Sequence, residues 1–496
     1  MSPRTLIGLC SLVVVVLSMT VALGPLEGIP HITDEIAYTL QSRLLAAGLR
    51  VGPPGDDPAL MSIPFWVVQP QTTSPFPVGW PLLLSIGERL GVPWLVNPLL
   101  AGLLPPLCWL LAREWTEEPI ARLSAVIMAL SPGVWILAAS RMSHTSVLVA
   151  LLLAAVVVSR GRDGLPAWAA AGLALAYVTL ARPFDGVVLG GALIGLALWR
   201  APSRRAWGLL VGAAGLGVLG TLADNLALTG DPLRFAMTAY LDDIARPGCN
   251  RLGFGPDVGC HATLGSLGHT PLKALQLAAD SAVRLDRLLL GIPGGLLLVA
   301  AGAWRLRRWE PLAIIGLVVV GYGLYWSPGQ ALGARFWHPA YPALAVLLAA
   351  GLYPLTQRLS PLVVLAVTLA GGTMVASDLS DRLWCVDGRL VAALEAEGFT
   401  EGVVFLQGSG VREMRWSSLS IDRFRCTPLL EAGDGFMAQD PLGGGLRFRH
   451  ALPDAESTEN YLSIHHPGSP AILVTHDIEA DERTLIPVPP QHPPEP

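Results

Sequence analysis

Charged side chains are scarce in this 496-residue sequence: 14% of its residues are Asp, Glu, Lys or Arg, whereas 52% are hydrophobic. Soluble domains carry roughly 25% charged residues, so much of the chain cannot face water. The net charge of −5 gives no basic surface suited to nucleic acid. There is also no P-loop, no GxGxxG after a predicted strand, no HExxH and no CxxC pair. We therefore expect no nucleic-acid partner, no metal and no other cofactor.

Apolar runs of about 20 residues, the length that crosses a bilayer core of about 30 Å, recur along most of the chain. They predict a mostly α fold class, a polytopic transmembrane helical bundle of about eleven spans. The predicted spans lie near residues 5–24, 93–112, 119–139, 145–159, 166–181, 184–199, 206–227, 288–304, 311–326, 339–354 and 360–377.

Basic residues gather in alternate connections between these spans. Because Lys and Arg resist translocation, the connections that carry them stay in the cytoplasm. The clusters include Arg160 with Arg162, and Arg305 with Arg307 and Arg308. All of them fall on one side when the N-terminus is cytoplasmic, so we expect a multi-pass protein in this orientation.

This topology leaves three long segments on the outer side: 25–92, 228–287 and everything after 377. In the first of them, Ile36, Leu40 and Leu44 share one face of a predicted helix over 33–47. We expect that helix to lie in the membrane interface with its apolar face toward the lipid. The later stretch SPFPVGWPLLLSIGERLG predicts a second interfacial or re-entrant helix.

The tail differs from the bundle in composition. GVVFLQG and AILVTHD have the pattern of short strands, and LVAALEAEG has that of a short helix. We therefore expect a transmembrane module over 1–377 and a small α/β periplasmic domain over 378–485. The remaining residues, 486–496, are rich in proline and predict a disordered tail.

Four of the six cysteines fall in the predicted outer segments. Cys249 and Cys260 lie in the second outer loop, and Cys385 and Cys426 lie in the tail. Two local pairs in an oxidising compartment favour two disulfides, with four free thiols as the alternative.

Polar groups that carry chemistry in a membrane protein belong at span ends or in loops, because charge within the hydrocarbon is costly. The first candidate is Asp34–Glu35, just after the first span. A carboxylate there can remove a proton from an attacking hydroxyl or amine. The simpler interpretation is that both acids only complement the dipole of the helix they begin.

Two arginines stand at the outer ends of later spans. Arg182 is followed by Asp185, and Arg335 is followed by His338. Either guanidinium can bind a phosphate with its fork of N–H donors. The alternatives are an Arg182–Asp185 ion pair that fixes a turn, and an Arg335 that reaches the interface beside an aromatic belt. His144, in a very short outer turn, is either a substrate contact or a structural residue.

Together these residues resemble the GT-C superfamily of membrane glycosyltransferases, and within it the bacterial relatives of protein O-mannosyltransferases and aminoarabinose transferases. The resemblance covers about residues 1–377. It rests on the order of four motifs: Asp34-Glu35-x-x-Tyr38, Pro77-Val78-Gly79-Trp80-Pro81, Ala181-Arg182-Pro183, and Ala334-Arg335-Phe336 leading into Pro339-Ala340-Tyr341-Pro342.

The resemblance implies an inverting hexosyl or pentosyl transferase of the bacterial inner membrane. Such an enzyme moves a sugar from a polyprenyl-phosphate carrier to a lipid, glycan or protein acceptor on the periplasmic face. It implies that Asp34 is the catalytic base, assisted or oriented by Glu35, and that Arg335 and Arg182 hold the donor phosphate. Membrane lipids are further expected partners. Candidate substrate contacts are Tyr38, His144, Asp185 and His338.

One departure from the family pattern concerns the next outer loop, where many relatives carry a second acid and this chain has Ser143-His144.

Two other functions remain open. A transporter or lipid flippase predicts ionisable residues at mid-membrane and paired broken helices, whereas the predicted spans contain almost no charge and no repeat. A scaffold without activity would use only its outer tail to bind a partner.

Overall fold

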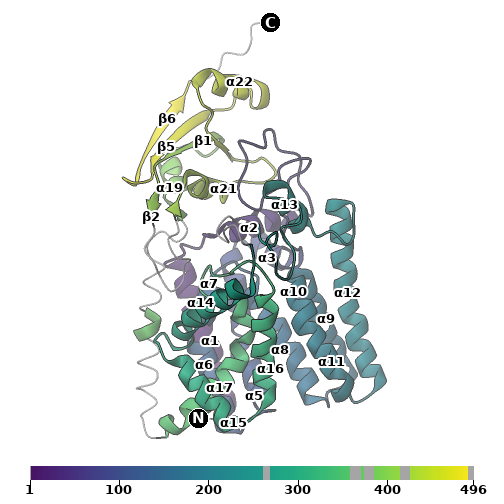
Figure 1. Cartoon of the computed structure of the whole chain (residues 1–496). Coiled ribbons are helices and arrows are strands. Elements are labelled where there is room, and N and C mark those ends of the chain that lie inside the picture. Colours follow the sequence, from purple (N-terminus) through teal and green to yellow (C-terminus); the bar gives the residue numbers. More distant parts are fainter. Residues whose placement is uncertain (1, 261–267, 358–369, 374–384, 414–424, 490–496) are drawn as a thin grey trace.

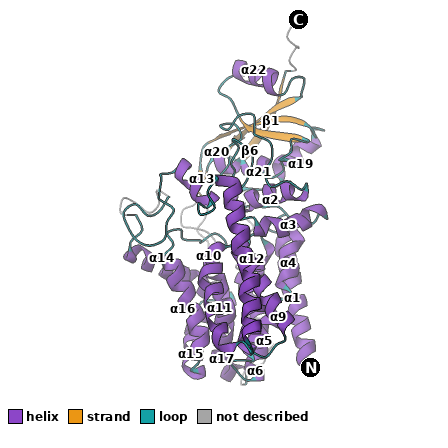
Figure 2. Cartoon of the chain, turned by 90° about the vertical axis from the view of Figure 1, so that its right-hand side faces the viewer, coloured by secondary structure: helices purple, strands orange, loops and turns teal. Residues whose placement is uncertain are grey.

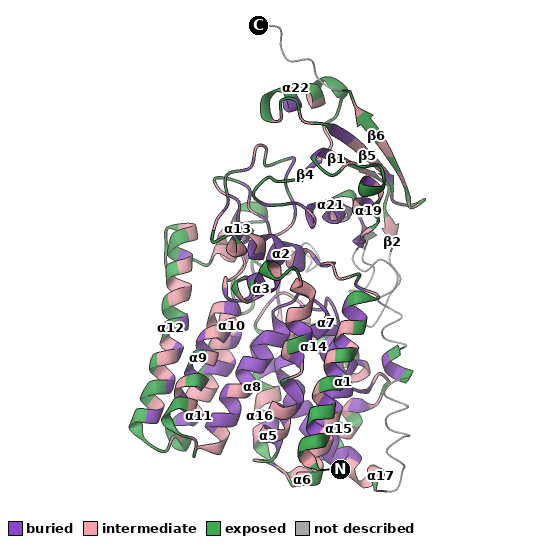
Figure 3. Ribbon diagram, turned by 180° about the vertical axis from the view of Figure 1, so that it is seen from behind, coloured by how far each residue is buried: buried purple, intermediate pink, exposed green. Residues whose placement is uncertain are grey.

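The computed structural model describes residues 2–260, 268–357, 370–373, 385–413 and 425–489 (Figure 1). Helices form a bundle at the end that holds the N-terminus, and the strands gather in a separate domain at the opposite end (Figure 2). A layer of short helices and loops lies between the bundle and this domain (Figure 3). The molecule thus has three tiers, and the middle tier joins the other two.

The bundle is built from apolar helices, several of which carry proline in their first turn and several of which end at glycine. Gly161 and Gly230, with φ of 65° and 75°, end two of them in the left-handed conformation that suits glycine. The bundle elements are α1 (Pro3–Leu23), η1 (Pro93–Leu95), α4 (Val96–Ala101), α5 (Leu104–Ala112), α6 (Glu118–Leu130), α7 (Pro132–Ala139), α8 (His144–Arg160), α9 (Leu165–Ala181), α10 (Pro183–Asp185), η2 (Gly186–Gly190), α11 (Gly191–Arg200), α12 (Arg204–Thr229), α15 (Gly295–Leu306), α16 (Trp309–Gly323), η4 (Arg335–Ala340) and α17 (Tyr341–Thr356).

Within the described residues, 5 helices are long and apolar enough to cross a membrane, or up to 7 if each of two bent pairs counts as one span. Shorter apolar helices occupy three more predicted positions, at α8, α9 and α16. The span predicted over 360–377 lies largely outside the described residues. The bundle is therefore of the membrane-spanning kind, and the count of eleven spans stays a prediction.

The continuous span predicted over 288–304 is wrong. α14 (Pro271–Leu290) ends at Gly291, and α15 leaves the break at an angle of 87° to it. Gly291 and Gly294 have φ of 77° and 103°, which only glycine adopts easily, and Pro293 lies between them. Hydropathy shows that this stretch is apolar, but it does not reveal the sharp bend between α14 and α15.

The middle tier contains α2 (Thr33–Ala46), α3 (Gly79–Arg89), α13 (Ala236–Ile244) and α14. The helix predicted over 33–47 is present as α2, but the environment predicted for its apolar face is wrong. Ile36, Leu40 and Leu44 are buried in a hydrophobic cluster shared with the C-terminal domain, rather than exposed to lipid. Their partners from that domain include Val386, Leu390, Phe436 and Phe448. An amphipathic pattern predicts a buried face, whatever covers it.

The C-terminal domain is a four-stranded sheet with helices, in the strand order β4-β1-β5-β6. β1 is parallel to both of its neighbours, and β6 is antiparallel to β5. The elements are α19 (Arg389–Ala396), β1 (Gly402–Ser409), β2 (Arg412–Glu413), β3 (Arg425–Cys426), α20 (Pro428–Glu431), α21 (Gly433–Phe436), β4 (Leu446–His450), α22 (Ala455–His465), β5 (Ala471–Asp477) and β6 (Glu482–Val488).

The C-terminal domain extends further along the chain than the sequence predicts. The tail predicted to begin at 486 is wrong for its first residues, because β6 continues to Val488 and pairs Pro487 with Ile472. Proline is tolerated there because β6 is an edge strand. Residues 490–496 and the predicted domain boundary at 377/378 lie outside the described residues.

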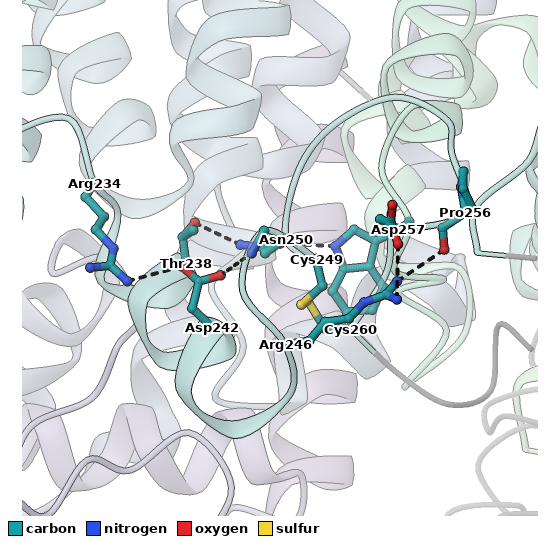
Figure 4. Close-up of a disulfide and its surroundings, with 11 residues drawn as sticks. Arg234, Thr238, Asp242, Arg246, Cys249, Asn250, Pro256, Asp257 and Cys260 are labelled. Atoms are coloured by element: carbon teal, nitrogen blue, oxygen red, sulfur yellow. Dashed lines mark hydrogen bonds and ion pairs between the residues drawn. A yellow bond between two sulfur atoms is a disulfide. The ribbon is translucent and has the colours of Figure 1, made fainter. Parts of the chain in front are cut away.

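Both expected cysteine pairs are bonded in the structure. Cys249–Cys260 closes a loop that follows α13, and the neighbouring Asn250 side chain bonds to Thr238 and Trp326 (Figure 4). Cys385–Cys426 joins the entry of the C-terminal domain to β3. Each bond restrains a loop on the side of the bundle away from the N-terminus.

The C-terminal domain is also held by polar contacts to the first outer segment. Arg43 of α2 donates to the carbonyls of Met437 and Gln439, at 2.7 and 2.8 Å. The Asp56 carboxylate accepts from Arg449 and from the Tyr461 hydroxyl. Burial acts to raise the pKa of Asp56, but hydrogen bonds from His466, Arg449 and Tyr461 outweigh burial and hold this pKa well below its usual range.

Candidate active site

Asp34 and Arg335 meet where the middle tier rests on the bundle. The Arg335 Nη2 lies 3.0 Å from the Asp34 Oδ2, and the two side chains are only 11% and 14% exposed. Asp34 stands in the first turn of α2, where the helix dipole favours an anion. Arg335 begins η4, directly before α17. The fold therefore joins two of the predicted site residues from segments that are distant in the sequence.

Glu35, which the resemblance implies assists or orients Asp34, accepts backbone N–H groups through both of its carboxylate oxygens. Its Oε2 accepts the backbone N–H groups of His31 and Ile32, both at 3.0 Å, which caps the start of α2. Its Oε1 accepts the backbone N–H of Arg141 at 2.6 Å. Because both oxygens are occupied by backbone donors, Glu35 is not placed to accept a substrate proton. It fixes the helix that carries Asp34 against the turn between α7 and α8.

Arg182 lies at the centre of a second polar group. Its Nε donates to Asp185, its Nη2 donates to the Tyr322 hydroxyl at 2.7 Å, and that hydroxyl donates to the Asp185 Oδ1 at 2.7 Å. Its Nη1 lies 3.0 Å from the His144 Nε2. The Arg182–Asp185 ion pair considered from the sequence is thus present. Together the contacts with Asp185, Tyr322 and His144 use three of the five N–H groups of Arg182 and leave two for other partners.

A single aromatic ring connects the two arginines. The guanidinium carbons of Arg182 and Arg335 lie 5.4 and 5.5 Å from the centroid of the Phe336 ring. The same ring stacks on Tyr322, with centroids 4.9 Å apart, and on His144, with centroids 6.2 Å apart. These distances allow cation–π attraction at a partly buried ring. Phe336 belongs to one of the four motifs, but nothing in the sequence indicates that its ring contacts both cations.

The PVGWP segment explains how the second group is positioned. A Cβ on Gly79 would lie 2.6 Å from the backbone N of Ala181 and 2.6 Å from the backbone C of Leu180. Only glycine therefore lets α3 contact the end of α9, directly before Arg182. The adjacent Trp80 Nε1 donates to the backbone carbonyl of Arg141 at 2.7 Å, which ties α3 to the turn before His144.

Tyr38 and His338 complete the set of predicted contacts. Tyr38, one turn after Asp34 on α2, packs on Phe76 with centroids 4.6 Å apart. Burial, with a smaller effect of the Asp34 carboxylate, raises the pKa of Tyr38 to about 12, so that it is a neutral phenol at pH 7. His338 is fully buried against Tyr341.

Several buried nitrogens of the site have no hydrogen-bond partner within the described part of the chain. They are the Arg335 Nε, the His144 Nδ1 and both ring nitrogens of His338. Buried polar groups in proteins nearly always have partners, because an unmet group costs free energy. Four such atoms in one region indicate a place for a polar ligand. Among the described residues, no group of three or more His, Cys, Asp or Glu side chains is arranged to hold a metal ion.

An apolar cavity of about 600 Å³ adjoins this polar region. Pro339, which follows His338 in η4, lines it, and so do Pro342 and residues along α8, α11 and α16. Apolar lining residues include Leu148, Leu152, Ala155, Leu193 and Leu317. Arg200 and Glu310, at the N-terminal side of the bundle, line its far end. The cavity thus runs along the bundle and begins beside the site.

The chain combines an apolar bundle, a buried acid–arginine pair and a separate α/β domain, and it shares its fold with solved membrane proteins of the GT-C class. ArnT from Cupriavidus metallidurans in the apo state matches with a TM-score of 0.53 and 14% identity, over 97% of this chain and 98% of ArnT. The same protein bound to undecaprenyl phosphate matches with a TM-score of 0.54 and 13% identity, over 98% and 99% of the two chains.

A weaker likeness, with a TM-score of 0.38 and 11% identity, links 92% of this chain to 58% of the archaeal oligosaccharyltransferase AglB from Archaeoglobus fulgidus. It adds nothing to the assignment of the fold. No protein-family model matches the sequence, and no curated protein matches it significantly. The comparisons therefore establish the fold over nearly the whole chain.

Proposed function

We propose that this chain is an inverting glycosyltransferase that moves a sugar from a polyprenyl-phosphate donor to a lipid, glycan or protein acceptor. The observation that carries the proposal is the Asp34–Arg335 pair beside a long apolar cavity. A polyprenyl-phosphate sugar has an apolar chain and an anionic head, and this arrangement offers a place for each. ArnT, whose fold the chain shares, was solved with undecaprenyl phosphate bound.

The reaction would be a single displacement at the anomeric carbon. Asp34 takes the proton of the attacking acceptor group as the new bond to the anomeric carbon forms. The bond from that carbon to the phosphate oxygen breaks, and polyprenyl phosphate leaves with the electron pair. Arg335 stabilises the charge that grows on the leaving phosphate, with Arg182 as a more distant contributor. No cofactor beyond the donor lipid is part of the proposal.

We place the site at the periplasmic face of a bacterial inner membrane. The N-terminus and the C-terminal domain lie at opposite ends of the bundle, which supports opposite sides of the membrane for them (Figure 1). Two disulfides on the side of the C-terminal domain suit an oxidising compartment. A cytoplasmic N-terminus and about eleven spans complete this topology.

The class of donor is tested by supplying the purified protein with a labelled sugar in two forms. We expect transfer from the polyprenyl-phosphate sugar and none from the corresponding nucleotide sugar, because a nucleotide has no apolar chain that could fill the cavity. Mass spectrometry of lipid, glycan and peptide fractions identifies the acceptor. Transfer from the nucleotide sugar alone would contradict the proposal.

The cavity itself is tested on α11 with a matched pair of substitutions. Gly195 lines the cavity, and a Cβ there meets no atom within 4 Å, so that Gly195→Trp fills the cavity without a clash at the Cβ. We expect its KM for a C55 donor to rise about 10-fold, because the ring displaces several buried methylenes of the chain. A C10 donor, whose short chain fills less of the cavity, should be affected much less.

Gly191→Trp is the control, since Gly191 lies one turn earlier on α11, has open space at its Cβ and is not a cavity residue. Its KM should match that of the unmodified protein for both donors. Equal KM values for Gly195→Trp and Gly191→Trp with the C55 donor would show that the chain lies elsewhere.

A further inference from the structure

His144 occupies the position where the family pattern has an acid, and its surroundings fix its protonation pattern. It begins α8, is 3% exposed, and its Nε2 lies 3.0 Å from the Arg182 Nη1. A guanidinium can only donate hydrogen bonds. The Nε2 must therefore be the acceptor, which places the proton of the neutral ring on Nδ1. While Arg182 holds Nε2, that atom cannot act as a base.

The resulting Nδ1–H is a buried donor without an acceptor in the described part of the chain. A second such donor, the Arg335 Nε, belongs to a guanidinium that contacts the same Phe336 ring as the imidazole. Two unmet donors beside one ring, with Arg182 next to them, form an environment that favours an anionic oxygen. The acids nearby, Asp34 and Asp185, already accept from arginines.

We propose that His144, held by Arg182, donates its Nδ1–H to a phosphate oxygen of the polyprenyl-phosphate donor. This inference rests on the proposed function, because it assigns a contact within the same site. It gives Arg182 a mainly indirect part: Arg182 orients the imidazole, and the imidazole contacts the phosphate. The histidine thus binds the lipid donor rather than replacing the missing acid at the acceptor.

Two substitutions separate the ring nitrogens. In His144→Asn the amide reaches the position of Nδ1, so that a donor remains there while the partner of Arg182 is lost. In His144→Gln the longer amide reaches the position of Nε2, so that its oxygen can still accept from Arg182 while the Nδ1 donor is lost. The structural contact and the proposed substrate contact are therefore removed one at a time.

The experiment measures binding of undecaprenyl phosphate and of undecaprenol to the purified full-length protein in detergent. We expect His144→Gln to weaken phosphate binding about 10-fold or more, the usual effect of losing a hydrogen bond to a charged group. His144→Asn should stay within about 3-fold of the unmodified protein. Neither variant should change binding of the alcohol, whereas a folding defect would weaken the binding of both the phosphate and the alcohol.

Three outcomes overturn the inference. Phosphate binding that is normal in His144→Gln and weakened in His144→Asn would mean that His144 only holds Arg182. Phosphate binding that is normal in both variants would mean that Nδ1 makes no contact. An unmodified protein that does not prefer the phosphate to the alcohol would overturn the proposed donor class as well. Normal phosphate preference without any sugar transfer would instead contradict the proposed function and leave the contact in place.

Discussion

Asp34→Asn is expected to lower the rate of sugar transfer by about 10³-fold, within the range that a general base contributes. The amide keeps the size of the side chain but cannot take the proton of the acceptor. The substitution also releases Arg335 from its ion pair, so binding of undecaprenyl phosphate should be unchanged or tighter. A large fall in kcat without loss of lipid binding would identify a defect in chemistry rather than in folding.

The measurement is single-turnover transfer from a polyprenyl-phosphate sugar, with lipid binding followed in parallel. Asp257→Asn is the control, because the Asp257 side chain is 69% exposed and pairs with Arg246 at the surface, in the loop after α13. Its transfer rate should be normal. If Asp34→Asn transfers sugar within tenfold of the unmodified protein, another group must be the base.

Gly302→Val is expected to destabilise the bundle by about 3 kcal/mol or more, at the upper end of the cost of overpacking. A Cβ on Gly302 of α15 would lie 1.7 Å from the backbone O of Leu347, and a Cβ on Gly351 of α17 would lie 2.1 Å from the backbone O of Leu298. The obstacles are backbone atoms, which cannot rotate away. Close contact of this kind is how small residues hold helices together in membranes.

The effect should reach the site, because α17 directly follows η4 and its Arg335. Thermal unfolding in detergent, followed by tryptophan fluorescence, measures the loss. Gly316→Val on α16 is the matched control, since a Cβ there meets no atom within 4 Å. Equal melting temperatures for the two variants would show that α15 and α17 are not packed through these glycines.

Hydropathy predicts the apolar helices well because a span must be apolar along its whole length, and nearly all predicted spans coincide with bundle helices. It fails at Gly291–Gly294, where the corner depends on backbone conformation rather than on polarity. It also cannot show that the apolar face of α2 contacts the C-terminal domain, because lipid and protein bury the same side chains.

The residues of the site were likewise predictable only in part from the sequence. The sequence predicts Asp34 and Arg335 as reactive groups, and the structure places them in contact. The resemblance implies that Asp34 is the base and that Glu35 assists or orients it, but nothing local in the sequence reveals that the backbone N–H of Arg141 will occupy one oxygen of Glu35. Tyr322 was not predicted at all, because an apolar helix gives no sign that its tyrosine bonds to Arg182 and Asp185.

The burial of α2 on both sides has a consequence for biosynthesis. The helix that carries Asp34 is translated near the start of the chain, whereas Phe436 and Phe448, which cover its apolar face, are translated near the end. Early segments of a nascent chain generally fold before late ones are made. A ribosome can therefore finish inserting the bundle while this helix still lacks its cover. Activity should appear only after the C-terminal domain has folded onto α2, so that incomplete chains in the membrane are inactive.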